Sequence, residues 1–311
     1  MSAARPITVV LCTHNPRADF LARTLSALGT QTLPADAWEL LVVDNASNPP
    51  LPLATLQAGH PGARVIVEPA LGLTQARLRG IAEARGDILV WVDDDNVLPS
   101  DYLAVAAALA REHPGLGVWG CGHFIPEWEQ APAPELTPYL AYLAVGQKSC
   151  DRWSNRPFDY EAMPPGAGLC VRASVARRYA ENVRHDPRRL TLGRTGAGLG
   201  ACEDFDLGLT AVESGYGTGV FTRLRMTHLM PAGRVREDYL LRLVEGHACS
   251  SLLLHHLHGR STPAPHGWLS ALRRWRLHRS LSPVQRRIAD ARRRGEVRGR
   301  AELAQFAASL S

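Results

Sequence analysis

Three consecutive aspartates, Asp93 to Asp95, follow the apolar run ILVWV at 88–92. Neighbouring carboxylates repel one another, and this repulsion costs free energy unless a positive charge lies between them. Carboxylate oxygens are also preferred ligands of Mg²⁺ and Mn²⁺. The triplet therefore predicts a cation site at the end of a strand, together with a ligand that the cation binds.

Other side chains that could do chemistry are Asp44, the pair Glu203 and Asp204, and His228. Each has an ordinary explanation when it is taken alone. An aspartate after a strand often makes a turn, an acidic pair at a helix start complements the helix dipole, and a single histidine is usually structural. The triplet is harder to explain in this way, because one aspartate is enough to make a turn.

The elements that must position these residues are visible in the hydrophobic pattern. Short β-branched runs predict strands, and segments of helical spacing lie between them. The strands are predicted at 7–12, 39–44, 63–68 and 87–92, and the helices at 15–31 and 72–85. Strands without polar alternation, separated by helices, indicate a parallel sheet covered on both faces. Ligands bind beyond the carboxyl ends of such strands. Asn15, Asp44 and the triplet all follow strand ends, so we expect them to border one crevice.

The second half of the chain is less regular. A glycine-rich loop at 192–201 precedes a predicted helix at 202–217, for which Gly215 is a C-cap candidate. A strand-like segment at 218–230 and a long amphipathic helix at 235–259 follow.

Composition limits the class of protein. With 311 residues, 45% of them hydrophobic, the chain can bury a large core. It shows no apolar run long enough to cross a bilayer and no signal peptide, so we expect a cytoplasmic protein. Eleven arginines stand against two acidic residues between Arg273 and Arg300, which leaves the remainder mildly acidic. A nucleic-acid-binding protein would carry its positive charge over the fold, and we expect no nucleic acid partner.

The basic tail from about 261 contains its own helix signal. Ser282, Pro283 and Gln285 form an N-cap, a first-turn proline and a capping-box partner. A narrow apolar stripe follows at Val284, Ile288 and Ala291. Such a helix can lie on anionic lipid or pack on the acidic surface of its own domain, and the sequence leaves both open.

The motifs, in their order along the chain, resemble those of the family 2 glycosyltransferases, enzymes of GT-A fold that move a sugar from a nucleoside diphosphate donor. The likeness runs through ITVVLCTHNP, VVDNAS, GLTQARLRGIAEARGDILVWVDDDN, GAGLCVR, CEDFDLGLTAVESGYG and MTHLMPAGR, over about residues 6–259. It implies an α/β, Rossmann-like, mostly parallel sheet flanked by helices, with a helical C-terminal extension. We expect a GT-A domain at 1–260, with a nucleotide-sugar-binding half at 1–122 and an acceptor-binding and catalytic half at 123–260. The basic helical tail would occupy 261–311.

The resemblance also implies where the donor binds. Thr13 and Asn15, in the loop after the first strand, would border the nucleoside, and Asp44 would accept a hydrogen bond from the base. A carboxylate suits a ring N–H, which favours UDP or dTDP sugars, although guanine also carries such a group. Arg77 matches the arginine of the family's ARNxG helix, but Leu78 stands where asparagine is common.

The metal site implied by the resemblance contains the family's D-x-D pair. Asp95 would contact Mn²⁺ or Mg²⁺ directly, while Asp93 would contact the ribose or a metal-bound water. Asp94 would reinforce the negative field. His228 matches the third metal contact or, alternatively, a phosphate contact, and Arg234 would meet the same diphosphate.

Catalysis would depend on the E-D motif. Asp204 matches the family's catalytic base, and Glu203 would orient the site. The resemblance implies that the reaction is a single displacement with inversion at the anomeric carbon. The chain lacks the Q-x-x-R-W signature and the membrane helices of processive members, so we expect transfer of one sugar at a time. The acceptor, whether a glycan, a lipid-linked or a small molecule, stays open. Aromatic residues between 119 and 153 are either an acceptor platform or core: Trp119, Trp128, Tyr139, Tyr142 and Trp153.

Other classes of protein remain as alternatives. A nucleotidyltransferase shares the scaffold type and the metal carboxylates, but it would normally show a glycine-rich, lysine-containing loop that LCTHNPRADF lacks. A non-catalytic nucleotide-sugar or glycan-binding module would need no base, so the presence of both Asp95 and Asp204 favours an enzyme. The tail adds the hypothesis of peripheral contact with the inner face of the membrane.

Overall fold

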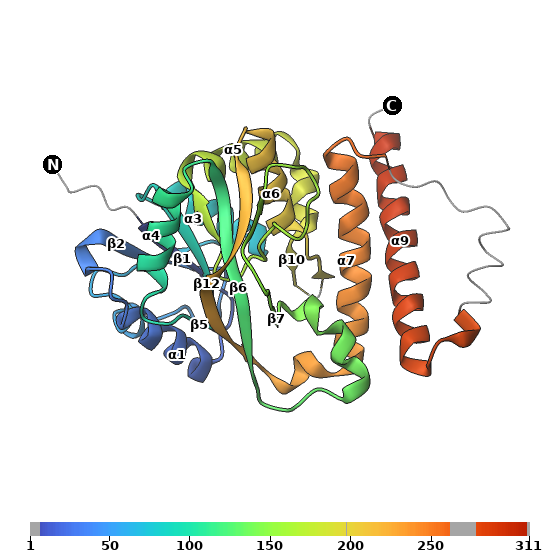
Figure 1. Cartoon of the computed structure of the whole chain (residues 1–311), viewed down its shortest axis with the longest axis horizontal. Helices are drawn as coiled ribbons and strands as arrows, with labels where there is room; N and C mark the ends of the chain where they lie inside the picture. Colours follow the sequence, from blue (N-terminus) through green and yellow to red (C-terminus); the bar gives the residue numbers. More distant parts are fainter. Residues whose placement is uncertain (1–6, 197, 262–277, 310–311) are drawn as a thin grey trace.

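Four parallel strands form one half of the central sheet. They are, in spatial order, β3 (Arg64–Val67), β2 (Trp38–Asp44), β1 (Ile7–Thr13) and β4 (Ile88–Asp93). The computed structural model describes residues 7–196, 198–261 and 278–309 (Figure 1). β1 and β2 are buried along their whole length, which explains why these runs lack polar alternation. The four predicted strands are confirmed to within one residue at each end.

The other half of the sheet mixes strand directions. β9 (Cys170–Arg172) lies antiparallel between β4 and β6 (Leu116–Trp128), and β6 pairs in parallel with β12 (Gly217–Met230). Three short strands pair antiparallel with these: β5 (Asn96–Val97) and β8 (Arg152–Ser154) with β12, and β7 (Gly146–Gln147) with β6. The prediction of a mostly parallel α/β sheet is confirmed.

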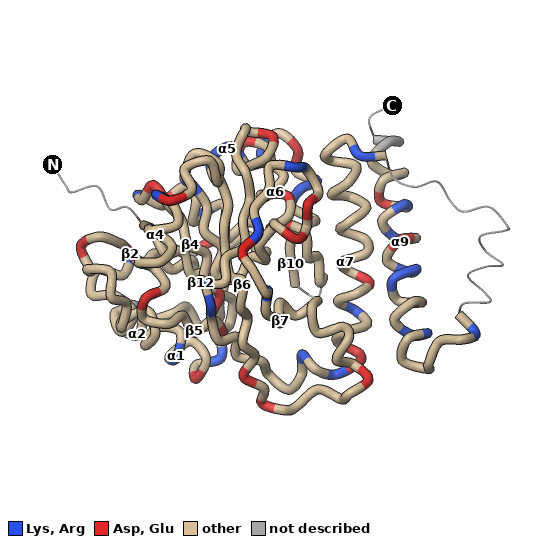
Figure 2. Tube along the Cα trace, in the orientation of Figure 1, with Lys and Arg blue, Asp and Glu red and all other residues tan. Residues whose placement is uncertain are grey.

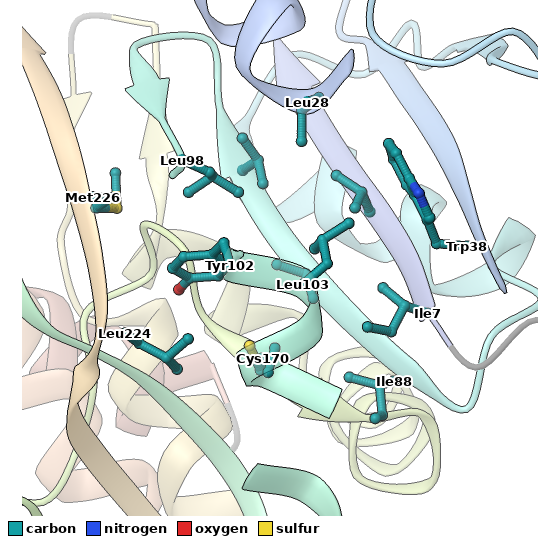
Figure 3. Close-up of a cluster of buried hydrophobic side chains, with 14 of the residues drawn as sticks. Ile7, Leu28, Trp38, Ile88, Leu98, Tyr102, Leu103, Cys170, Leu224 and Met226 are labelled. Atoms are coloured by element: carbon teal, nitrogen blue, oxygen red, sulfur yellow. The ribbon is translucent and has the colours of Figure 1, made fainter. Parts of the chain in front are cut away.

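Helices cover both faces of this sheet. One face carries α1 (Ala18–Gly29), α2 (Leu53–Leu56) and α4 (Tyr102–Glu112), and the other carries α3 (Leu73–Glu83), α5 (Ala173–His185) and α6 (Glu203–Glu213). Alternate residues of β1 separate between the two cores: Val9 and Leu11 face the first, and Val10 and Cys12 the second. Figure 3 shows the first core, where Leu103 and Trp38 pack beside Ile7.

Shorter elements connect these layers. The 3₁₀ helices are η1 (Ala35–Ala37), η2 (Pro134–Leu143), η3 (Pro187–Leu192) and η4 (Ala232–Val235). A two-stranded hairpin of β10 (Arg194–Thr195) and β11 (Gly198–Leu199) lies just before α6. Gly215 takes a left-handed φ of 84° after the end of α6, as predicted for a C-cap.

Strand register brings the ends of three strands to one edge. Thr13 on β1 pairs with Asp44 on β2, and Cys12 pairs with Asp93 on β4. Because neighbouring strands lie about 4.8 Å apart, these residues and those that follow them share the carboxyl edge of the sheet. The sequence prediction that Asn15, Asp44 and the triplet follow strand ends at one edge is confirmed.

The helix of the basic tail, α9 (Pro283–Ser309), packs against α7 (Glu237–Leu257) (Figure 1). It begins with the predicted capping box: the Gln285 N–H donates to Ser282 Oγ at 3.3 Å, and the Ser282 N–H donates to Gln285 Oε1 at 2.9 Å. The apolar stripe at Val284, Ile288 and Ala291 is at most 9% exposed and joins the core cluster of α7.

Charge reinforces this contact between the two helices. Arg294 and Arg298 of α9 both pair with Glu245 of α7, at 3.0 and 2.9 Å, and Arg287 pairs with Glu237 (Figure 2 shows both signs along the two helices). The sequence leaves lipid and protein open as partners of the stripe, and in the structure the stripe faces protein; contact with a membrane is not supported. Residues 262–277 of the predicted tail lie outside the described residues, and no helix in the described ranges is long and apolar enough to cross a membrane.

We expect Ile288→Ala to lower the free energy of unfolding by about 2 kcal/mol, because it deletes buried methyl groups between α9 and α7. Urea unfolding followed by circular dichroism measures this change. Val297→Ala on the same helix is the matched control, since Val297 is 60% exposed and its truncation should change stability by less than about 0.5 kcal/mol. Equal stability of the two variants would show that α9 does not hold this position in solution.

The aromatic residues predicted as a possible acceptor platform do not form one surface. Trp119 is 1% exposed in the first core, and Trp128, Tyr139 and Tyr142 pack against the cluster around α7. Trp153 is 59% exposed, but it pairs with Gly219 near the start of β12. His228 lies nine residues further along that strand, roughly 30 Å away at about 3.3 Å per residue. Trp119 is therefore core, whereas Trp128, Tyr139 and Tyr142 are half-buried.

Candidate active site

The loop after β2 is organised by Asp44. Its two carboxylate oxygens accept hydrogen bonds from the N–H groups of Ser47, at 3.0 Å, and Leu51, at 2.9 Å. Asp44 is 1% exposed, so it shapes the loop that would border a nucleoside. Asn15 is exposed, has a left-handed φ of 46°, and accepts a hydrogen bond from the Asn48 N–H at 2.8 Å. Direct contact of Asp44 with a base stays a prediction.

The aspartate triplet is held from both sides. Thr13 donates a hydrogen bond from its hydroxyl to Asp94, which links the ends of β1 and β4. Asn96 accepts from the Asp93 N–H at 3.0 Å and donates to Asp95 Oδ1 at 2.7 Å. Burial, together with the negative charge of Asp95, raises the pKa of Asp94 to about 6. The three carboxyl groups therefore repel one another, as the sequence predicts.

Asp95 is the centre of a second group of contacts. Arg234 Nη1 lies 2.9 Å from Asp95 Oδ2, and His228 Nε2 lies 3.5 Å from Asp95 Oδ1. The antiparallel pairing of His228 with Asn96, between β12 and β5, brings the histidine to this position. Burial opposes ionisation of Asp95, but Arg234 and His228 outweigh it and lower the pKa to about 2. Asp95, which is 4% exposed, is thus ionised at neutral pH.

The chemistry of this group fits a divalent cation. Within the described ranges, no three or more His, Cys, Asp or Glu side chains are arranged so that they hold a metal ion. Arg234 instead supplies the positive charge beside Asp95. Burial is the main cause of the raised pKa of Asp94, and the charge of Asp95 adds to it, so a hard cation beside these carboxylates would relieve part of their repulsion. Asp93, Asp95 and His228 are the residues whose ligand types suit it.

A buried arginine joins the triplet to the E-D motif. Arg77, on α3, is 2% exposed; its Nη1 donates to Glu203 Oε1 at 2.9 Å, and its Nη2 lies 3.8 Å from Asp93 Oδ1. The guanidinium lies over the ring of Trp91, 4.2 Å from the ring centre. Burial raises the pKa of Glu203 to about 7, although the charge of Arg77 acts in the opposite direction. Arg77 therefore connects the aspartate triplet at the end of β4 with the E-D motif at the start of α6.

Asp204 lies in the first turn of α6. Its Oδ2 accepts a hydrogen bond from the Gly166 N–H at 2.9 Å, and its Oδ1 accepts from the Phe205 N–H at 2.8 Å. Burial raises the pKa of Asp204, and Arg77 and these two N–H groups oppose the increase. The side chain is partly exposed, which leaves a fixed carboxylate that a substrate hydroxyl can reach.

Three residues of the site were not predicted from the sequence. Asn45 donates to the carbonyl groups of Glu68, at 3.0 Å, and Ala70, at 2.7 Å, and so fixes the neighbouring loops. Asn96 holds the triplet, and Arg194 lies within electrostatic reach of both Asp95 and Glu203. The signal for both asparagines was present, since each directly follows an aspartate at a strand end. No local pattern distinguishes Arg194 from the many other arginines.

Comparison with known sequences agrees with the motifs. The family described as glycosyl transferase family 2 matches residues 8–149. YwdF of Bacillus subtilis, described as an uncharacterized glycosyltransferase, is 32% identical over 97 residues, or 31% of this chain and 35% of that protein. The uncharacterized protein y4gI of Sinorhizobium fredii is 28% identical over 156 residues, 45% of this chain and 17% of that protein. The matches thus span about a third and a sixth of these relatives.

Solved structures support the fold. The mannosyltransferase PcManGT of Pyrobaculum calidifontis, in complex with GDP-Man and Mn²⁺, superposes with a TM-score of 0.53 at 19% identity, over 98% of this chain and 76% of that one. Residues 1–349 of S. aureus TarS give a TM-score of 0.50 at 15% identity, over 81% of this chain and 70% of that one. The family described as glycosyl transferase family 2 thus matches residues 8–149 of this chain, in agreement with the motifs, and the chain has the fold of the GT-A glycosyltransferases.

Proposed function

We propose that the protein is a metal-dependent, inverting glycosyltransferase that moves one sugar at a time from a nucleoside diphosphate sugar to an acceptor hydroxyl. The observation that carries this proposal is Arg77, which contacts Glu203 and also lies beside Asp93. It makes the acidic end of β4 and the start of α6 parts of a single site. A donor held at Asp93 to Asp95 would thus present its sugar to Asp204.

The acceptor hydroxyl must lose a proton as it attacks the sugar. Asp204 accepts that proton in this proposal, because its carboxylate is fixed by the Gly166 and Phe205 N–H groups and is partly exposed. Glu203 holds Arg77, and through it the spacing between the two sides of the site. Inversion follows from a single displacement in which the base and the leaving group lie on opposite sides of the anomeric carbon.

The donor diphosphate leaves with negative charge. Asp93, Asp95 and His228 would hold Mn²⁺ or Mg²⁺, and the bound ion would supply electrostatic stabilisation to the leaving diphosphate. The structurally similar PcManGT was solved with GDP-Man and Mn²⁺, which supports a nucleotide sugar and a divalent ion as ligands. Arg234, beside Asp95, would contact the same phosphates. The preference for UDP or dTDP over GDP stays a prediction, because both oxygens of Asp44 already bind the loop.

A non-catalytic nucleotide-sugar or glycan-binding module and a nucleotidyltransferase are the other functions that the sequence leaves open. The geometry around Asp204 favours a glycosyltransferase over both. Binding alone needs no positioned base, and no glycine-rich, lysine-containing phosphate loop follows β1. The acceptor class, and any place of action at a membrane, have no support in the contacts described.

We expect Asp95→Asn to abolish the Mn²⁺ dependence of nucleotide binding, because it removes the charge that would bind the ion while preserving the shape of the side chain. The measurement is a thermal shift with UDP, dTDP, GDP, CMP and their sugars, each with and without Mn²⁺. A ligand at a hundred times its dissociation constant stabilises the fold by about 2.7 kcal/mol, so a donor should be visible in the wild type.

Asp101→Asn is the matched control for this measurement, since Asp101 is exposed and lies beyond the triplet on the same stretch of chain. It should keep the Mn²⁺-dependent shift of the wild type. An Asp95→Asn protein with an unchanged shift would reject the metal site. A wild type that responds to none of the nucleotides would reject the proposed function itself.

A further inference from the structure

The β10–β11 hairpin lies against the proposed donor site, although it is distant in sequence from the donor-side strands. Gly193, at its start, abuts the side chain of Thr74 in the first turn of α3, and a Cβ at Gly193 would collide with Thr74 Oγ1. On the other side, the Leu199 carbonyl lies against Gly246 of α7, where a Cβ would also collide. The hairpin is therefore held between α3 and α7, and Figure 1 shows β10 beside α7.

This position is at the carboxyl edge of the sheet. The N–H of Gly72, immediately before α3, donates to Asn45 Oδ1 at 2.8 Å, and Asn45 directly follows Asp44. The Cys202 N–H donates to the Leu192 carbonyl at 3.1 Å and closes the base of the loop, one residue before Glu203. The hairpin thus connects the loops of the donor side with the start of the catalytic helix.

Arg194 is the charged side chain of this hairpin, and its charge is not used by the fold. It is half-buried, and among the described residues it forms no hydrogen bond or ion pair through its guanidinium. The other two arginines of the site already pair with protein carboxylates: Arg77 with Glu203 and Asp93, and Arg234 with Asp95. A half-buried guanidinium without a protein partner is an available anion ligand.

The charge of Arg194 acts on both sides of the site. At Asp95, burial raises the pKa and Arg234 lowers it, and the charge of Arg194 adds to the lowering. At Glu203, burial raises the pKa and Arg77 lowers it, and Arg194 again adds to the lowering. Its charge therefore acts on Asp95 and on Glu203, and the hairpin that carries it lies between α3 and α7, beside both.

We propose that Arg194 binds the diphosphate of the nucleotide-sugar donor, and that the β10–β11 hairpin is the element that brings this charge to the site. The inference rests on the proposed function and adds a binding residue to it. Five carboxyl groups border the site, at residues 93, 94, 95, 203 and 204, against the three arginines. A divalent cation would balance them when all are ionised, so loss of Arg194 would leave an excess of negative charge that repels a diphosphate.

The test compares the affinity of Arg194→Gln and of the wild type for UDP, dTDP and GDP with Mn²⁺, by titration calorimetry. Arg194→Gln should lower the affinity for the nucleoside diphosphate that the wild type binds by about tenfold, equivalent to about 1.4 kcal/mol. The affinity for the corresponding nucleoside, which has no phosphate, should change less than about twofold. Arg194→Lys should keep part of the affinity, because it restores the charge but not the bidentate geometry.

Arg184→Gln is the matched control, because Arg184 is exposed in the last turn of α5 and should have wild-type affinity. Equal diphosphate affinity of Arg194→Gln and the wild type would reject the role of Arg194 and leave the proposed function intact. An equal loss for nucleoside and nucleoside diphosphate would also reject it, since that pattern indicates a distorted hairpin. If the wild type binds no nucleoside diphosphate at all, the proposed function and this inference fail together.

Discussion

Asp204→Asn is expected to lower the rate of sugar transfer by about 10²-fold or more, while donor affinity stays within about twofold of wild type. Asparagine keeps an oxygen that can accept the hydrogen bond now made by the Gly166 N–H, so the loop and the start of α6 should keep their positions. It cannot accept a proton from the acceptor hydroxyl. Initial rates under saturating donor and calorimetric donor affinity separate the two effects.

The control for this substitution is Asp36→Asn, which makes the same chemical change at an exposed position of η1 and should transfer at the wild-type rate. Transfer by Asp204→Asn at an undiminished rate would remove Asp204 as the base. Loss of donor binding together with transfer would instead assign Asp204 to the shape of the site.

The pH profile gives a second measurement of the same role. Burial raises the pKa of both Glu203 and Asp204, in the case of Glu203 to about 7. A base works only when it is deprotonated, so the wild-type rate should rise as pH increases through the shared titration of this pair. Glu203→Gln removes one of the two interacting charges, and the rise should then shift to lower pH. A wild-type rate independent of pH between about 5 and 8 would contradict the assignment.

The parallel strands and the residues that end them could be predicted from the sequence. Strands buried on both faces read as unbroken apolar runs, and Asp44 and Asp93 are joined to those runs by peptide bonds. Fixing the strand therefore fixes the edge at which the carboxylates lie. Ser282 and Gln285 were predictable for a similar reason, because a capping box is local in sequence.

The contacts that turn these residues into one site could not be predicted in this way. Arg77 and Glu203 are 126 positions apart, and their pairing depends on how α3 and α6 pack on the same face of the sheet. Arg234 reaches Asp95 only because β12 pairs with β5. The contact of α9 with α7 also depends on a long-range fit: the sequence left lipid and protein open as partners of its apolar stripe, and Ile288 is buried against α7.

Helix α6 is also held against the rest of the chain by a buried ionic group that no sequence pattern indicated. Asp206, two residues after Asp204, is 0% exposed and pairs with Arg189 of η3. His258 Nε2, at the end of α7, lies 2.7 Å from Asp206 Oδ1, and its Nδ1 pairs with Glu213. Because Asp206 lies in the first turn of α6, this group fixes the helix that carries Glu203 and Asp204.

We expect Asp206→Ala to lower the free energy of unfolding by about 3–5 kcal/mol, because it leaves the charges of Arg189 and His258 without their buried partner. Urea unfolding measures the change. Glu213→Ala is the matched control: it also removes a carboxylate from His258, but the Glu213 side chain is 50% exposed and should contribute less than about 1 kcal/mol. Equal effects of the two substitutions would show that the buried contacts of Asp206 contribute no more to stability than the exposed pair of Glu213 with His258.

The loss should also depend on pH. Burial opposes protonation of His258, but its hydrogen bonds to Asp206 and Glu213 outweigh this effect and raise its pKa above the unfolded value of about 6.5. The stability that comes from the protonated imidazole is thus complete below that unfolded pKa and disappears as pH rises through the folded one. Asp206→Ala removes a partner that raises the pKa, so its destabilisation should be larger at pH 6 than at pH 9. A penalty that is constant across this range would mean that His258 is neutral in the folded protein and that Arg189 alone compensates Asp206.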